Sequence, residues 1–388
     1  MDIWTILTYT DLFIFIFVAL TVLYLGFFAF TSLFARHSEI PKAKNQNRFI
    51  VIIPSLKSGK SLETTVNCIL GQAYPQRLFD VTVIADHEDE ITMFHLAQQP
   101  ITLLTPISGK NTRTKSLQLA VNNLPQFKIY DAVIILDPGD IVEPDFLEQM
   151  NDAYESAGTK VIQAHKVSFN RDTVSARLQA VFEEINNSIF RRGHISVGLS
   201  AALSSSGMVF DFSWFKQQIL AAKINWADKE LEVLLLRHHI YVDYFDKIIV
   251  FGEKTRQAED FNRQHRNWIF TQWRTILRNL QYLPQAIFQK HYDMIDKILQ
   301  WLILPRMVMM VIILIMCVVT PYIYFTMAIK WWALFAIVLL IFSMATPDYL
   351  VDEKWDSTFF KVPVVLMSSF LHKFKIGRKI TEFINLKQ

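Results

Sequence analysis

The chain has 388 residues, of which 52% are hydrophobic, and its mean hydropathy is positive. A soluble core of this length needs less apolar surface, so part of the chain is expected to lie in lipid. The formal net charge of +3 gives no indication of nucleic-acid binding. Two cysteines, Cys68 and Cys317, are too few and too far apart for a disulfide framework or a zinc site, and they fit cytosolic thiols.

The first predicted element is a transmembrane helix within residues 1–36. Residues 10–34 carry one charged side chain, Asp11, and as a helix they are long enough to cross a hydrocarbon core of about 30 Å. The segment before them has no Lys or Arg, and the apolar run is longer than that of a signal peptide. We therefore expect a retained helix rather than a cleaved leader.

Residues 48–256 alternate short apolar runs with amphipathic stretches, which predicts an α/β domain with a mostly parallel sheet. The runs 49–54, 81–86 and 132–137 are rich in β-branched residues and lack polar alternation, as strands buried on both faces do. Two of them end in Asp86 and Asp137. Because ligands bind outside the carboxyl ends of strands in open α/β sheets, we expect both carboxylates near one crevice.

The segments after this domain are predicted to contact the membrane. Residues 257–301 have basic side chains on one side and apolar ones at helical spacing on the other, which indicates amphipathic helices on the leaflet. Residues 302–347 hold two apolar runs separated by Lys330, which predicts a transmembrane hairpin whose first helix is kinked or ended by Pro321. Trp331 and Trp332 are expected at the interface. Residues 355–388 form a basic segment, broken by Pro363, that is expected to be interfacial.

The placement of basic residues predicts the orientation of the chain. Lys and Arg follow the first and the last apolar run, whereas the N-terminus has none. Because positive charge is retained on the cytosolic side, the α/β domain and the C-terminus are expected in the cytosol and the N-terminus on the opposite side.

Six segments follow one another in the chain: IIPS (52–55), ILGQAYPQRLFDVTVIADHEDE (69–90), IILDPGDIVEPDFL (134–147), LSSSGMVF (203–210), WADKELEV (226–233) and QHRNW (264–268). In this order they resemble the membrane-bound glycosyltransferases of family 2, which include chitin-oligosaccharide, hyaluronan and cellulose synthases. The resemblance implies a GT-A-like nucleotide-diphospho-sugar transferase domain. It also implies inverting transfer from a nucleotide diphosphate donor, expected to be a UDP-sugar, to a saccharide or lipid-linked saccharide.

The resemblance assigns a Mg²⁺ or Mn²⁺ ion to Asp137 and Asp140. A departing diphosphate needs positive charge on its oxygens, and hard cations bind carboxylate oxygens. The family usually has two Asp separated by one residue, whereas Pro138 and Gly139 separate them here. In the other interpretation, Asp140 caps a simple turn.

The resemblance places five side chains at the donor. Asp86 and Asp89 match the residues that contact the uracil or ribose, and Lys115 lies in a basic segment near the donor phosphates. Gln264 and Trp268 share one helix face, and Trp268 is expected to stack on the sugar or base. In the alternative interpretations, Asp86 and Asp89 are solvated loop acids, Lys115 lies on an exposed helix face, and Trp268 is an interfacial anchor.

Asp228 is the expected catalytic base, which removes the proton of the acceptor hydroxyl. It stands where the family has Glu-Asp, but Ala227 replaces the Glu, and Asp228 would also serve as the N-cap of the following helix. Ser206 and Gly207 resemble the small-residue turn beside the acceptor, where Ser205 replaces a common Gly.

The altered motifs leave a second interpretation open, a non-catalytic subunit that binds nucleotide sugar or a protein partner. A transporter is disfavoured because the apolar runs 307–346 contain a single charged residue, Lys330, expected at a loop position. Three transmembrane helices form a thin wall for a channel, so an oligomer or a partner subunit would be needed for product translocation.

Overall fold

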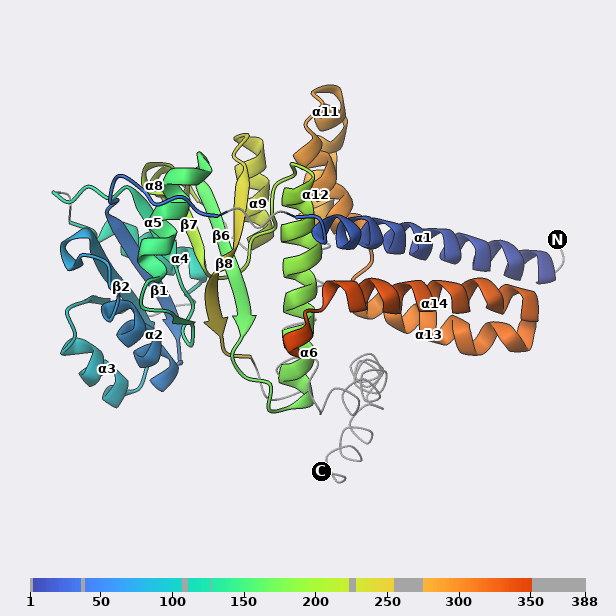
Figure 1. The fold of residues 1–388 in the computed structure, drawn as a ribbon, viewed down its shortest axis with the longest axis horizontal. Helices are drawn as coiled ribbons and strands as arrows, with labels where there is room; N and C mark the ends of the chain where they lie inside the picture. The colour runs from blue at the N-terminus through green and yellow to red at the C-terminus, as the bar shows by residue number, and fades with distance from the viewer. Residues whose placement is uncertain are drawn as a thin grey trace.

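The computed structural model describes residues 3–35, 39–106, 111–125, 127–222, 228–254 and 275–350. It consists of an α/β domain and a bundle of long helices, with helix α6 (Val174–Asn186) lying between them (Figure 1). Gln264, Trp268 and the segment 355–388 lie outside the described residues. So does the part of the expected interfacial segment 257–301 that precedes residue 275.

The described part of the α/β domain is built on an eight-stranded sheet with the order β3-β2-β1-β4-β7-β6-β8-β5. Strands β3, β2, β1 and β4 pair in parallel with one another, as predicted, and β6 is parallel to β8. Strand β7 is antiparallel to both β4 and β6, and β5 is antiparallel to β8. The bounds are β1 Phe49–Leu56, β2 Phe79–Asp86, β3 Thr102–Leu104, β4 Ala132–Ile135, β5 Ile141–Val142, β6 Val161–Ser168, β7 Met208–Asp211 and β8 Val242–Gly252.

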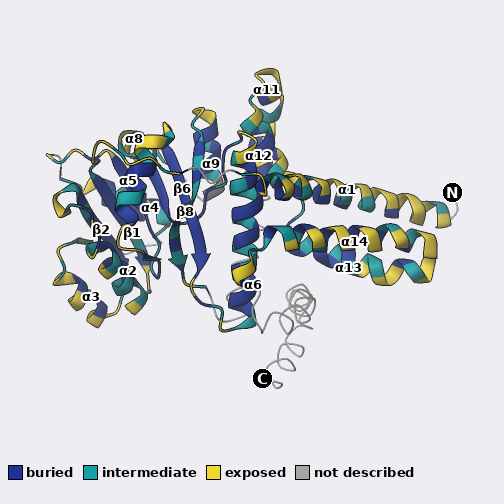
Figure 2. Ribbon diagram, in the orientation of Figure 1, coloured by how far each residue is buried: buried dark blue, intermediate teal, exposed yellow. Residues whose placement is uncertain are grey.

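Helices cover both faces of the sheet, which explains why its central strands lack polar alternation. Phe49, Val51 and Ile53 of β1 pack in one core with α2 (Lys60–Leu70), α3 (Glu90–Ala97) and α5 (Phe146–Ala157). Ile50 and Ile52 pack in a second core with α4 (Arg113–Asn122), α8 (Phe212–Ala221) and α9 (Asp228–Arg237). Successive side chains of a strand point to opposite faces, so β1 contributes to both cores. The central strands are coloured mostly as buried in Figure 2.

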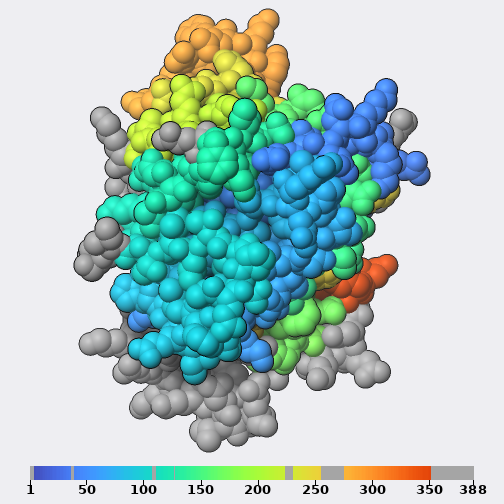
Figure 3. Space-filling view, turned by 90° about the vertical axis from the view of Figure 1, so that its left-hand side faces the viewer, coloured from blue at the N-terminus to red at the C-terminus, as the bar shows by residue number. Residues whose placement is uncertain are grey.

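Three helices among the described residues are long and apolar enough to cross a membrane. They are α1 (Ile3–Ser32), α13 (Arg306–Ile323) and α14 (Phe325–Ala345), which extend side by side away from the sheet (Figure 1). The remaining short elements are η1 Gln76–Leu78, η2 Asn187–Arg192, α7 Gly193–Ser196, η3 Leu280–Tyr282, α11 Leu283–Phe288, α12 Tyr292–Leu302 and η4 Asp348–Leu350. Seen from the end opposite the long helices, the surface belongs mostly to the first half of the chain (Figure 3).

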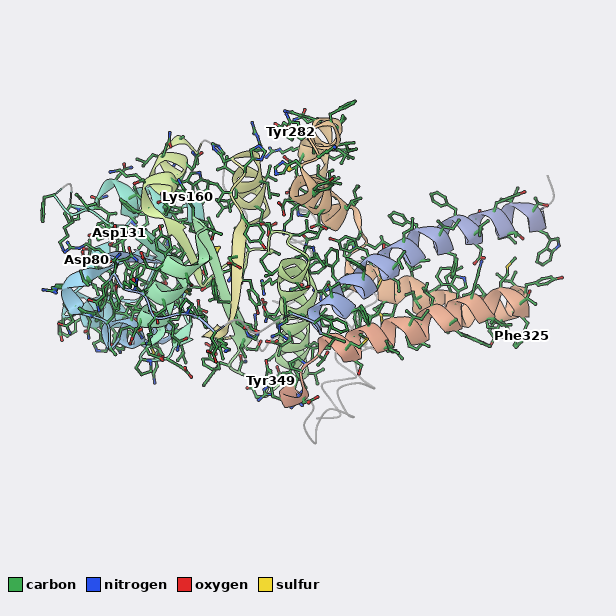
Figure 4. The ribbon with its side chains drawn as sticks, turned by 45° about the horizontal axis from the view of Figure 1, so that its top comes forward. Asp80, Asp131, Lys160, Tyr282, Phe325 and Tyr349 are labelled. Carbon is green, nitrogen blue, oxygen red and sulfur yellow. The ribbon has the colours of Figure 1, made fainter. Side chains whose placement is uncertain are left out.

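The turn of the α13–α14 hairpin differs from the predicted one. Helix α13 ends at Ile323, shortly after Pro321, and α14 begins at Phe325, which lies at the far tip of the hairpin (Figure 4). Lys330 is therefore inside α14 rather than in a loop. It is held there by an ion pair with Asp11 of α1, and Trp331, expected at the interface, is fully buried in the bundle.

Candidate active site

Asp86 and Asp137 both lie at the carboxyl ends of strands, as predicted. Asp86 is the last residue of β2, and Asp137 follows β4 by two residues. Both strands pair in parallel with β1, which lies between them, so their ends share one edge of the sheet. Two strand spacings separate them, roughly 10 Å. The sheet thus places Asp86 and Asp137 at the same edge, as the pattern of strands in the sequence predicted.

The Asp137–Asp140 turn is fixed by hydrogen bonds from three directions. Asp140 is 2% exposed, and its Oδ2 accepts hydrogen bonds from the backbone N of Asp137 at 2.8 Å and from the Ser206 hydroxyl. Gly139 has φ +87°, which favours glycine, and its N donates to Thr65 Oγ1 of α2 at 2.9 Å. Asp140 is therefore a buried anchor of the turn, as the alternative interpretation of the sequence also expected.

Two cations contact these carboxylates. Arg113, the first residue of α4, places Nη1 2.6 Å from Asp137 Oδ1 and donates from Nη2 to the Ser205 carbonyl. Lys166 of β6 places its Nζ 3.4 Å from Asp137 Oδ2 and 3.5 Å from Asp140 Oδ1. We call these four residues the ion cluster. A Cβ at Gly252 would lie 2.7 Å from Lys166 Cε, so glycine at this position leaves room for the lysine.

The ion cluster separates the pKa values of its two acids. Burial by itself would raise the pKa of Asp137, but Arg113 and Lys166 outweigh it and lower the pKa to about 2. Burial raises the pKa of Asp140; Lys166 opposes the rise, and the charge of Asp137 adds to it. The carboxylates outweigh the burial of Lys166 and raise its pKa to about 12. Asp137 and Lys166 are therefore charged at neutral pH.

This arrangement does not fit a divalent cation. Each oxygen of Asp137 faces a cationic nitrogen, and the oxygens of Asp140 face Lys166, a hydroxyl and a backbone N–H. Within the residues that the structure describes, no three His, Cys, Asp or Glu side chains gather where they could hold a metal ion. Two unit charges 4 Å apart repel by about 4 kcal/mol at an effective dielectric constant of 20, and a dication doubles that value.

The loop before β7 connects the ion cluster to α9. Ser206 is fully buried, and Gly207 has φ +68°, where a Cβ would lie 3.0 Å from Val250 Cγ2. The backbone N of Leu203 donates to Glu232 Oε1 of α9 at 2.6 Å. Asp228 is the first residue of α9 and lies one helical turn before Glu232. The side chain of Asp228 lies outside the described residues.

The acids after β2 have separate local roles. Asp86 Oδ1 lies 2.5 Å from His87 Nδ1. Glu88 accepts hydrogen bonds from Ser55 Oγ at 2.6 Å, and its Oε2 accepts from the backbone N of Gly59 at 2.7 Å, which ties the β1–α2 loop to the β2–α3 loop. Asp89 caps α3 by accepting from Thr92 N at 2.7 Å, and this hydrogen bond lowers its pKa. Asp89 therefore has a structural role as a helix N-cap, which the sequence analysis did not predict.

Of the remaining predicted donor residues, Lys115 is exposed on α4, and Gln264 and Trp268 lie outside the described residues. The sequence analysis missed Arg113, Lys166 and Glu88. A lysine inside the otherwise apolar strand 161–168 was a readable signal for Lys166, because buried lysines need a charged partner. Arg113 carried no such signal, since a basic residue at a helix start is normally solvated.

The model of a family described as glycosyltransferase like family 2 matches residues 46–271, more than half of the chain. The chain belongs to glycosyltransferase like family 2. The match includes all six segments that carried the resemblance. No curated protein sequence matches the chain.

Solved structures of glycosyltransferases share the fold of this family 2 chain. The mannosyltransferase PcManGT from Pyrobaculum calidifontis, in complex with GDP-Man and Mn²⁺, has a TM-score of 0.53 at 12% identity, with 91% of this chain and 94% of that chain covered. S. aureus TarS 1-349 in complex with UDP-GlcNAc has a TM-score of 0.43 at 14% identity, with 88% and 92% covered. The first likeness shows the expected GT-A-like fold, and the second score is too low to support more.

Proposed function

We propose that this glycosyltransferase moves a sugar from a nucleotide diphosphate donor to a hydroxyl of a saccharide or lipid-linked saccharide at the cytosolic face of a membrane. The observation that supports this most is that Asp86 and the Asp137–Asp140 turn lie at the ends of strands that share one edge of the sheet, with Ser206 bonded to that turn. Asp228 is assigned from the sequence resemblance. The product of this transfer, a saccharide extended by one sugar, would belong to polysaccharide biosynthesis.

The proposed reaction is a single displacement that inverts the anomeric carbon. Asp228 takes the proton of the acceptor hydroxyl as its oxygen attacks, and the nucleoside diphosphate leaves from the opposite side. Ser206 and Gly207 shape the acceptor side, Ser206 through its hydrogen bond to Asp140. Gly207 acts through the backbone conformation that it allows.

The proposed donor side consists of Asp86, Asp89, Lys115, Gln264 and Trp268. A UDP-sugar with a hexosyl or N-acetylhexosaminyl group is the expected donor, and the complex of PcManGT with GDP-Man makes GDP-sugars the second set to test. The resemblance predicts Mg²⁺ or Mn²⁺ at Asp137 and Asp140, and the PcManGT complex contains Mn²⁺, but the ion cluster of this chain is at odds with that prediction.

The proposed topology keeps the N-terminus outside the cytosol. Residues 1–36 span the membrane, residues 48–256 form the cytosolic transferase domain, and residues 302–347 return through the bilayer. Residues 257–301 and 355–388 lie on the cytosolic leaflet, with an oligomer or partner subunit as a further expectation. The apolar surfaces of α1, α13 and α14 support this arrangement.

The function is tested by offering UDP- and GDP-sugars to membranes that carry the full chain and measuring release of the nucleoside diphosphate and labelling of the acceptor. We expect turnover with one donor, lowered by about 10²- to 10⁴-fold in Asp228→Asn because the general base is lost. Glu230→Gln on the same helix is the matched control and should keep turnover. Nucleotide binding without turnover for any donor would instead support the non-catalytic subunit.

A further inference from the structure

The ion cluster places fixed positive charge where this reaction needs it. In family 2 transfer the diphosphate leaves with added negative charge, and catalysis requires a cation near its oxygens. Arg113 and Lys166 both contact Asp137 and come from different elements, α4 and β6. Together they carry the same charge as one divalent cation.

We propose that Arg113 and Lys166 neutralise the leaving diphosphate in this chain in place of a divalent cation. This inference rests on the proposed function. The Arg113 side chain is 29% exposed and that of Lys166 is 9% exposed, so the guanidinium is the group that solvent and a bound diphosphate can reach. Lys166 is the more buried of the two cations and contacts both carboxylates. Its positive charge offsets the negative charges of Asp137 and Asp140, so that these two anions do not cancel the charge of Arg113.

The position of Arg113 suits this role for two further reasons. Its guanidinium is oriented by Asp137 Oδ1 and by the Ser205 carbonyl, so little rotational freedom has to be lost on binding. It is also the first residue of α4, whose N-terminal amides favour anions. Planar guanidinium groups bind phosphate oxygens with two N–H donors, which makes arginine a fitting partner for a diphosphate.

The step balances without a metal. The bond between the acceptor oxygen and the anomeric carbon forms as the bond between that carbon and the β-phosphate oxygen breaks. The electron pair of the broken bond stays on the phosphate oxygen, beside Arg113, and the acceptor proton goes to the Asp228 carboxylate. No oxidant or further reactant is required.

Binding of UDP and GDP to the purified full chain in detergent, measured by calorimetry, tests the inference. We expect one of the two nucleotides to bind with the same Kd in excess EDTA as in excess Mn²⁺. Arg113→Gln should weaken binding in EDTA by about tenfold or more, equivalent to about 1.4 kcal/mol, and Arg113→Lys should retain part of the affinity. Electron paramagnetic resonance of a Mn²⁺ titration of the wild type should detect no bound ion.

Lys128→Gln is the matched control. Lys128 pairs with Asp80 at 2.7 Å, and the exposure of this pair is close to that of Arg113 and Asp137. Asp80 lies near the start of β2, six residues before Asp86, or roughly 20 Å along the strand. Figure 4 shows Asp80 beside Asp131 at the end of the domain far from the long helices. This variant should bind nucleotide as the wild type does.

The outcomes separate the inference from the proposed function. Binding that disappears in EDTA and returns with Mn²⁺, or a bound Mn²⁺ signal, overturns the inference while the proposed function stands. Unchanged affinity of a folded Arg113→Gln in EDTA also overturns it. If neither nucleotide binds under any condition, the proposed function fails and the inference fails with it.

Discussion

At the scale of single residues, neighbouring acids of one motif have different physical tasks. In the run 86–90, Asp86 contacts His87, Glu88 holds the loop after β1, and Asp89 caps a helix. Glu88 satisfies two backbone N–H groups and one hydroxyl that would otherwise lack these bonds. Because hydrogen bonds to a charged acceptor contribute more than neutral ones, Glu88 is the acid on which the geometry of the β1–α2 and β2–α3 loops depends most.

Glu88→Gln should therefore lower the free energy of unfolding by about 1–2 kcal/mol, because the amide loses the charge and turns an NH₂ group toward N–H donors. Thermal unfolding of the purified chain in detergent measures the change. Glu90→Gln is the control, since Glu90 is exposed in the first turn of α3. Equal unfolding temperatures for the two variants would contradict this role of Glu88.

At the scale of elements, the α/β domain is joined to the long apolar helix α1 by a close backbone contact. Gly193, at the start of α7, lies against Phe28 of α1, and a Cβ at Gly193 would be 2.3 Å from the Phe28 carbonyl oxygen. Thr31 Oγ1 donates to the Gly193 carbonyl at 3.1 Å, and Ser32 Oγ lies 2.8 Å from Ser188 Oγ. Backbone cannot move aside as a flexible side chain does, so glycine is required for this distance.

Gly193→Ala is expected to destabilise the protein by about 1–3 kcal/mol, as overpacking of a close contact does. The control is Gly26→Ala in α1, where the added Cβ meets only the terminal methyl of Ile341, which can rotate away. Alanine also favours the helix at that position. Thermal unfolding in detergent should show a lower midpoint for Gly193→Ala alone, and a similar loss in both variants would refute the contact argument.

At the scale of the whole molecule, side chains far apart in the sequence hold the bundle together. Asp11 of α1 is 7% exposed, pairs with Lys330 of α14, and accepts a hydrogen bond from Trp331 Nε1 at 2.8 Å. Phe15 lies 4.8 Å from the Lys330 ammonium, measured to the ring centroid. Asp11 is a charged residue within an apolar span, and so is Lys330. Their opposite charges neutralise each other where α1 and α14 meet.

Lys330→Met should lower stability by about 3–5 kcal/mol, because it leaves Asp11 buried without its partner. The double variant Asp11→Asn/Lys330→Met should be more stable than Lys330→Met alone, since no unpaired charge remains. A double-mutant cycle from thermal unfolding of the four proteins measures the coupling. Strictly additive effects of the two substitutions would show that the ion pair does not join α1 to α14.

The fold was predictable from the sequence to a large degree, and the site only in part. The runs at 49–54, 81–86 and 132–137 predicted β1, β2 and β4 because strands buried on both faces have a simple apolar signature. Asp86 and Asp137 followed from the shared edge of parallel strands. The partners of Asp137 did not follow, because Arg113 and Lys166 are brought to it by α4 and by a strand that lies on the far side of β7.

The sequence by itself determined what depends on local pattern: the apolar length of α1 and the hairpin, the buried strands, and the order of motifs that marks a family 2 glycosyltransferase. Only the tertiary structure decided what depends on distance between remote residues, namely the two cations at Asp137, the hydroxyl of Ser206 at Asp140, and the pairing of Lys330 with Asp11. The energy of an ion pair or a hydrogen bond depends on the distance in space between its two partners. The number of residues between them along the chain does not determine that distance.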